Sequence, residues 1–134
     1  MPDNTMHLRV RYCECDPMGI AHHASYPVWL EMGRTELCRG VGLAYRDMEE
    51  TGAFFAVTRL EVRYQHPIRY DDELVVRTML ERATRVKLVH RYEILRDGLV
   101  TTTAETTVAC VGADGRPRAM PEQLRRAIGV PDDG

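Results

Sequence analysis

The sequence predicts an α+β domain in which an antiparallel sheet of about five strands wraps around one long central helix. Three observations predict this fold. A segment of alternating apolar and polar residues opens the chain, one long segment with helical periodicity follows, and four more alternating segments come in succession. Only one helix is long enough to cover the apolar face of such a sheet, so the sheet is expected to curl around it. A length of 134 residues suits a single domain spanning residues 1–134.

The first strand and the long helix follow from two different periods. Apolar residues alternate with arginines at Leu8, Val10 and Tyr12, which predicts a half-buried strand that ends at the turn 17–19. The period then changes, and apolar residues fall on one helical face at Tyr26, Trp29, Leu30, Gly33 and Leu37. The polar face carries Glu31, Arg34, Glu36 and Arg39. Ser25 is the expected N-cap, and Gly40 or Gly42 is expected to end the helix.

The remaining strands are predicted from four segments with period-two alternation. They cover residues 58–64, 73–80, 86–95 and 100–111. Asp97–Gly98 predicts a tight hairpin turn between the last two strands, and Asp114–Gly115 predicts a second turn. Short helices are expected at 46–50 and 121–128. Because such a sheet leaves edges open, pairing with a second copy is expected, giving at least a homodimer.

Composition and charge exclude several classes of function. The net charge is −2, with 44% hydrophobic and 28% charged residues, so bulk electrostatic binding of nucleic acid is not expected. No apolar segment approaches the length of a membrane span, and no secretory signal is recognisable, so we expect a cytoplasmic protein that does not bind membranes. Its four cysteines are then expected to be free thiols.

The segment Cys13–Arg34 concentrates the residues that can carry chemistry. A zinc site would use Cys13, Cys15, His22 and His23, but the cysteines are two residues apart and the histidines are adjacent. Neither pair has the usual chelating spacing, so no metal is expected. A polar strand-to-helix loop without a function is the alternative.

A catalytic interpretation of the same segment depends on Asp16. If the strand alternation continues, Asp16 shares the phase of Leu8, Val10 and Tyr12 and points to the covered face. Gly19 permits a tight turn, and the chain then reaches the first turn of the long helix. Free N–H groups and the positive dipole end there could stabilise a developing oxyanion. The arrangement suits acyl transfer without a metal.

The segment "YCECDPMGIAHHASYPVWLEMGRTEL" resembles the hotdog-fold acyl-CoA thioesterases of the 4-hydroxybenzoyl-CoA thioesterase family. The matching positions are Asp16, Gly19, His23, Tyr26, Trp29, Glu31 and Arg34. "VRYQHPIRYDDELVVRT" is similar to the family as well, and the resemblance covers roughly residues 5–112. It implies a hotdog fold and hydrolysis of an acyl-CoA to a free acid and CoA, without a cofactor, in a homodimer or homotetramer.

The resemblance also implies roles for individual residues. Asp16 would act as nucleophile or general base, and the main-chain N–H of His23 would polarise the thioester carbonyl. A part for the His22 or His23 side chain stays open. Gly19 and Tyr26 would line the substrate site. Arg85 and Lys87 would contact the CoA nucleotide. The alternative is ordinary solvation on the exposed face of the strand, since arginines are frequent throughout this chain.

Other functions remain possible at this point. A non-catalytic acyl-CoA-binding module of the same fold is the main alternative, and Asp16 argues against it because a mere binder needs no carboxylate beside a thioester. A hotdog hydratase would use a differently placed histidine. The zinc-binding domain is the third alternative.

Overall fold

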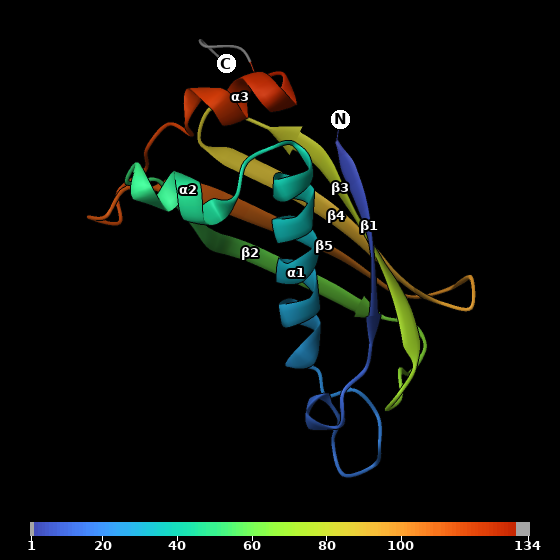
Figure 1. Cartoon of the computed structure of the whole chain (residues 1–134). Helices are drawn as coiled ribbons and strands as arrows, with labels where there is room; N and C mark the ends of the chain where they lie inside the picture. The colour runs from blue at the N-terminus through green and yellow to red at the C-terminus, as the bar shows by residue number, and fades with distance from the viewer. Residues whose placement is uncertain (1, 131–134) are drawn as a thin grey trace.

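A computed structural model of the protein describes residues 2–130 (Figure 1). Its strands are β1 (Asp3–Arg9), β2 (Phe54–Tyr64), β3 (Glu73–Ala83), β4 (Lys87–Arg96) and β5 (Leu99–Val111). Its α-helices are α1 (Ser25–Gly40), α2 (Tyr45–Glu50) and α3 (Glu122–Ile128), and a 3₁₀ helix, η1, spans Tyr12–Glu14. The predicted α+β fold with its five strands and one long helix is confirmed.

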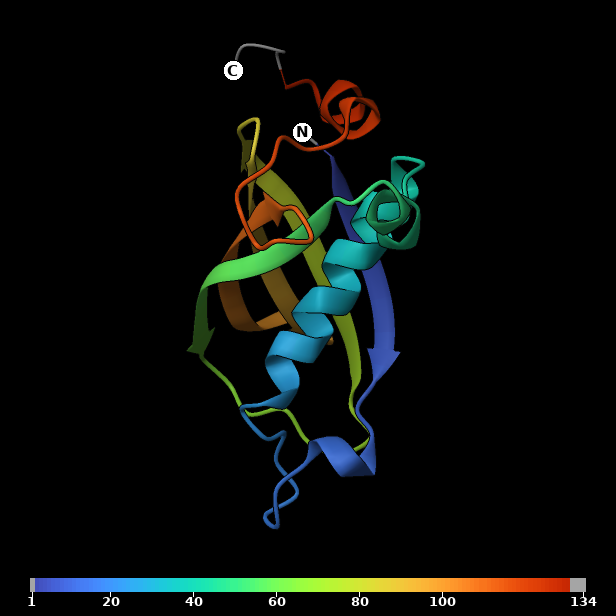
Figure 2. The same cartoon turned by 90° about the vertical axis from the view of Figure 1, so that its left-hand side faces the viewer.

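The five strands form one antiparallel sheet in the order β1-β3-β4-β5-β2. α1 lies across one face of this sheet, and the strands curve around it (Figures 1 and 2). The helix packs mainly against β1 and β3. β1 and β2 are the two edges of the sheet. Because α1 packs mainly against β1 and β3, the side of the sheet that carries β2 is less covered by the helix.

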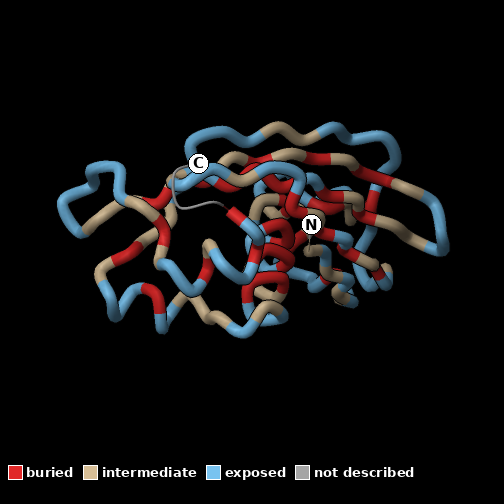
Figure 3. Tube along the Cα trace, turned by 90° about the horizontal axis from the view of Figure 1, so that it is seen from above, coloured by how far each residue is buried: buried red, intermediate tan, exposed pale blue. Residues whose placement is uncertain are grey.

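The core forms where α1 meets the sheet. Trp29 and Leu30 are fully buried among residues of β3 and β4, and the predicted apolar helix face is confirmed (Figure 3). Burial of such side chains contributes about 2 kcal/mol each. Gly33 lies so close to the sheet that a Cβ atom there would overlap Thr78 Oγ1. A second cluster joins the end of α1 to α2 and α3 around Met48 and Met120.

Three local expectations were wrong. Tyr12 is 81% exposed because η1 interrupts the strand, which ends at Arg9, so the alternation cannot be extended to Asp16. Ala24 rather than Ser25 is the N-cap of α1. Arg34, assigned to the solvent face of the helix, is only 7% exposed. Among the helices of residues 2–130, none is long and apolar enough to span a bilayer.

Candidate active site

The loop between β1 and α1 is held in shape by the main chain. The main-chain N–H of Asp16 donates to the carbonyl oxygen of Ile20 at 2.8 Å. The N–H of Gly19 donates to the carbonyl oxygen of Asp16 at 3.0 Å. Gly19 has a φ of 77°, which a residue with a side chain rarely adopts, so the expected tight turn at Gly19 is confirmed. Bridges from Cys15 to Ala21 and from Ile20 to Arg69 tie the loop to itself and to the segment before β3.

This loop presents the Asp16 carboxylate with its two oxygens in different surroundings. Oδ1 accepts hydrogen bonds from the main-chain N–H groups of Met18 (2.8 Å) and Ile20 (3.2 Å). Oδ2 has no hydrogen-bond partner within residues 2–130. Asp16 is half-buried and lines a cavity of about 360 Å³, together with Tyr12, Cys15, Pro17, Gly19 and Tyr70. One oxygen is therefore fixed while the other stays available.

The residues just before α1, which follow this loop directly in the sequence, carry main-chain N–H groups. Ala24 N–H donates to His22 Nδ1 at 3.0 Å, so the His22 side chain acts as a local cap. The His22 and His23 rings stack with centroids 4.2 Å apart, and both residues are exposed. The main-chain N–H of His23 finds no acceptor in the described part of the chain. A free donor at a helix N-terminus is suited to a developing negative charge.

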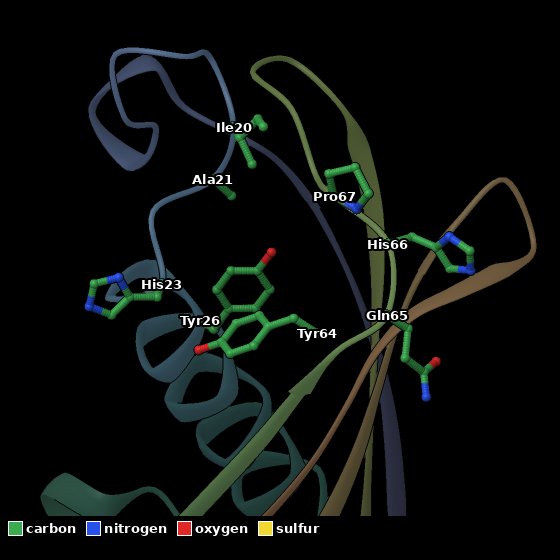
Figure 4. A pocket seen from close by; sticks show the side chains of 8 residues that line it. All are labelled: Ile20, Ala21, His23, Tyr26, Tyr64, Gln65, His66 and Pro67. Atoms are coloured by element: carbon green, nitrogen blue, oxygen red, sulfur yellow. The ribbon is translucent and has the colours of Figure 1, made fainter.

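A second cavity, of about 330 Å³, opens beside the helix start (Figure 4). Its lining residues are Ile20, Ala21, His23, Tyr26, Tyr64, Gln65, His66 and Pro67. The rings of Tyr26 and Tyr64 meet edge to face with centroids 4.8 Å apart, and burial raises the pKa of the Tyr26 hydroxyl. The imidazole of His23 extends away from the other labelled side chains (Figure 4).

The predicted site residues are therefore only partly brought together. Asp16 and Gly19 line one cavity, whereas His23 and Tyr26 line the other. Gly19 lines the first cavity, and the next two residues, Ile20 and Ala21, line the second. Both lie at the same end of α1.

The predicted nucleotide contacts lie elsewhere. Arg85 and Lys87 are exposed at the turn between β3 and β4. That turn is at the end of the sheet opposite to the loop of Asp16 (Figures 1 and 2). Within one chain these two basic residues do not approach the cavities.

Glu14 is a functional-site neighbour that the sequence interpretation missed. This carboxylate is buried, and it accepts hydrogen bonds from Arg11 N–H at 2.7 Å and from Trp29 Nε1 at 2.7 Å. Burial alone would raise the pKa of Glu14, but the hydrogen bonds from Arg11 and Trp29 outweigh it and lower the pKa. Glu14 thereby fastens the loop to α1. Its position two residues before Asp16, next to a helix with a single tryptophan, was the signal available.

No group of three or more potential metal ligands gathers within residues 2–130. Cys13 is exposed, and its thiol is free, as are those of Cys15, Cys38 and Cys110. The site consists of a carboxylate, main-chain donors and aromatic walls. Such a set of groups suits acyl transfer, in which a carboxylate attacks or activates water and N–H groups stabilise the oxyanion.

Comparison with known proteins agrees with this chemistry. Residues 10–128 match the thioesterase-like superfamily. The chain is 36% identical to YneP of Bacillus subtilis over 122 residues, which is 90% of this chain and 86% of YneP. It is 30% identical to the acyl-CoA thioester hydrolase YbgC of Escherichia coli O157:H7 over 119 residues, covering 87% of this chain and 89% of YbgC.

Solved structures give the same result. The DHNA-CoA thioesterase of Staphylococcus aureus superposes with a TM-score of 0.86 at 33% identity, covering 94% of this chain and 83% of that protein. The resemblance to hotdog-fold thioesterases is thus confirmed. The chain belongs to the thioesterase-like superfamily.

Proposed function

We propose that this thioesterase hydrolyses an acyl-CoA to the free carboxylic acid and CoA, with Asp16 as the catalytic carboxylate. One observation carries the proposal. Asp16 Oδ1 is fixed by two main-chain N–H groups, while Oδ2 is unpartnered and the residue lines a cavity next to the start of α1. Acyl-CoA is the substrate class of the related YbgC.

Two chemical roles are open to Oδ2. As a nucleophile it would attack the thioester carbon, the C–S bond would break, CoA would leave as the thiolate, and water would then hydrolyse the mixed anhydride. As a general base it would take a proton from a water molecule that attacks the same carbon. The fixed Oδ1 orients Oδ2 for either role. Heavy oxygen found in Asp16 after a single turnover in heavy-oxygen water would establish the nucleophile, since only an anhydride that water opens at the Asp16 carbonyl leaves the label there. If water opens the anhydride at the acyl carbon, both routes place the label in the acid product.

The N-terminus of α1 completes the proposed chemistry. The unpartnered N–H of His23 would donate to the carbonyl oxygen as it becomes negative. Because the His23 ring extends away from the other side chains that line the cavity, the main chain rather than the imidazole is assigned this role (Figure 4). The proposal places the thioester carbonyl between Asp16 and the helix start.

The experiment that tests the proposal is thiol release from a panel of acyl-CoAs by wild type and Asp16→Asn. Asparagine keeps an oxygen that can accept the N–H groups of Met18 and Ile20 but removes the charge. The expected result is a loss of at least about a hundredfold in kcat with the fold retained. Asp114→Asn is the matched control, because Asp114 Oδ1 accepts an N–H two residues on, from Arg116 at 3.0 Å, in a remote turn.

A non-catalytic acyl-CoA-binding module is the alternative function. Wild type that binds acyl-CoA but releases no thiol from any member of the panel would contradict the enzyme and favour the module. Equal rates for wild type and Asp16→Asn would retain a thioesterase but remove Asp16 from its chemistry.

A homodimer, or a dimer of such dimers, is proposed as the working form. Five exposed apolar residues line the less covered side of the sheet and the neighbouring face of α1: Val28, Met32, Val57, Leu60 and Tyr64. Leu60 and Tyr64 stand opposite buried threonines of β5, so they belong to the face that α1 covers only in part. A second copy would bury this apolar strip. Sedimentation of the wild type as a monomer at micromolar concentration would contradict the proposal.

Binding of the CoA nucleotide by Arg85 and Lys87 also requires a second copy. Because these residues lie far from Asp16 in their own chain, only those of a partner could approach the site. The expected effect of Arg85→Glu is a raised KM for acyl-CoA with little change in kcat. We further propose a cytoplasmic location, in which the free thiols would stay reduced.

A further inference from the structure

Two exposed tyrosine rings line the cavity that contains Asp16. Tyr12 is 81% exposed and Tyr70 is 51% exposed. Their rings nevertheless contact each other edge to face, with centroids 5.6 Å apart. Both residues border the cavity of about 360 Å³ together with Asp16. Large aromatic rings that remain in solvent are typical of binding surfaces, and the hydrolysis proposed above assigns these two no task.

The main chain holds the two rings beside the loop between β1 and α1. Tyr12 begins η1, which ends the strand alternation and leaves the ring in solvent. The N–H of Tyr70 donates to the carbonyl oxygen of Gly19 at 3.1 Å, which fastens the segment before β3 to the loop. The next residue, Asp71, has a φ of 71°, which a residue with a side chain rarely adopts. It is held there by its N–H, which donates to the carbonyl oxygen of Val10 at 3.1 Å. Three separate segments of the chain therefore converge at the rings.

This cavity lies away from the surface that the proposed homodimer buries. The apolar strip belongs to β2 and α1, whereas the cavity is lined by residues of η1, of the loop after it and of the segment before β3. β1, which η1 follows, is at the opposite edge of the sheet from β2. Figures 1 and 2 show this blue loop projecting beyond the end of the sheet. A dimer formed through the strip therefore does not require the two rings to be buried.

The two cavities at this end of α1 differ in their exposure to solvent. The cavity beside the helix start includes the buried residues Ala21 and Tyr26, so an apolar acyl group would be shielded from water there. The Asp16 cavity is bordered by exposed rings instead. At about 30 Å³ per water molecule, it has room for on the order of twelve non-hydrogen atoms. That size suits the sulfur-side half of pantetheine, the flexible arm that carries the thioester in an acyl-CoA.

Given the hydrolysis proposed above, on which this inference rests, we propose that Tyr12 and Tyr70 bind the pantetheine arm of the substrate. The methylene groups of the arm lie along the two rings, the thioester carbon lies next to Asp16, and the acyl group enters the cavity beside α1. Tyrosine suits this task because its ring offers a large contact area and loses little conformational freedom on binding. Binding energy from this non-reacting part of the substrate then holds the thioester in position for attack.

Thiol release from two thioesters of one acyl group, the pantetheine thioester and the S-ethyl thioester, tests this inference. The acyl group is the one that wild type hydrolyses best in the acyl-CoA panel. The kcat/KM of wild type is expected to be at least about thirtyfold higher for the pantetheine thioester than for the ethyl thioester. In Tyr12→Ala and in Tyr70→Ala this ratio is expected to fall at least about tenfold.

Conservative variants and a remote control separate the rings from other effects. Tyr12→Phe and Tyr70→Phe keep the rings, so they are expected to restore the ratio to within about threefold of wild type. Leu99→Ala removes an exposed apolar side chain of the β4–β5 hairpin that lines neither cavity, and it is expected to leave the ratio unchanged. Because Tyr12 and Tyr70 are exposed, their alanine variants are expected to fold, which circular dichroism checks.

An active enzyme whose ratio is unchanged in both alanine variants would overturn the inference, because the rings would then not contact the arm. A ratio as low in the phenylalanine variants as in the alanine variants would overturn it too, since the rings are retained. Should a variant not fold, the wild-type ratio itself decides, and a ratio near one would contradict binding of the arm. Wild type that releases no thiol from either thioester, or from any acyl-CoA, would instead contradict the proposed hydrolysis.

Discussion

Two carboxylates, two residues apart, occupy opposite kinds of surroundings in the loop before α1. Glu14, in η1, is buried, and both its oxygens are hydrogen-bonded, to Arg11 and Trp29. Asp16, in the following turn, has one oxygen bound by the main chain and one without a partner. A carboxylate whose two oxygens both accept hydrogen bonds holds the loop in place. A carboxylate with one unpartnered oxygen beside a cavity is available for chemistry.

Removing the charge of Glu14 tests whether this carboxylate stabilises the fold. In Glu14→Gln an amide N–H₂ replaces one acceptor and faces a donor, either Trp29 Nε1 or Arg11. The unfolding free energy is expected to fall by about 2 kcal/mol. Urea unfolding followed by the fluorescence of Trp29, the only tryptophan, measures it. Glu81→Gln, at an exposed position of β3, is the control, and an equal loss there would show that Glu14 has no special role.

The sequence predicted the fold well because each element carries its own period. The strands β2 to β5 and the apolar face of α1 follow from alternation and helical spacing, and Trp29 and Leu30 are core residues as expected. Asp16 was singled out by its motif, although the strand-phase argument for its direction was wrong. Three residues of η1 were enough to break the alternation, and a single 3₁₀ turn leaves no periodic signal.

Burial that depends on residues far apart in the sequence could not be predicted from local patterns. Arg34 shares a helix face with Glu31, yet it is buried because Tyr92 and Thr106, some 58 residues and more further along the chain, provide a polar place for it. The position of Arg85 and Lys87 opposite to Asp16 depends on the length and order of strands. Burial of Glu14 depends on its meeting with Trp29 across fifteen residues.

The pH dependence of the unfolding free energy is a second test of the role of Glu14. The pKa of Glu14 is lowered in the folded protein, so the unfolded state binds more protons in acid. Its contribution is complete above the unfolded value of about 4.3 and is lost as the pH falls through the lowered pKa. Wild type and Glu14→Gln should therefore converge in unfolding free energy below about pH 4. A constant difference down to pH 3 would contradict the account.

His90 affects both proteins in that titration alike. Its pKa is lowered to about 3, so its neutral form is buried, and stability declines as the pH falls below about 6.5, where the unfolded histidine takes up a proton. Because His90 is present in wild type and variant, the difference between them reports Glu14 alone.

The smallest effect is expected at the His23 side chain. If the main chain of this residue contacts the oxyanion, His23→Ala should change kcat by less than about threefold. His22→Ala, which removes the acceptor of the Ala24 N–H, is the companion variant. Steady-state thiol release at neutral pH measures both. A loss of a hundredfold in His23→Ala would assign the imidazole itself to catalysis.

The most direct test of the contrast is to measure kcat and unfolding free energy together for Asp16→Asn and Glu14→Gln. The account predicts that Asp16→Asn loses at least about a hundredfold in kcat with its stability within about 0.5 kcal/mol of wild type. Glu14→Gln should lose stability while each folded molecule keeps most of its rate. An Asp16→Asn protein that remains fully active, or one that fails only because it unfolds, would contradict the assignment of Asp16 as the catalytic carboxylate.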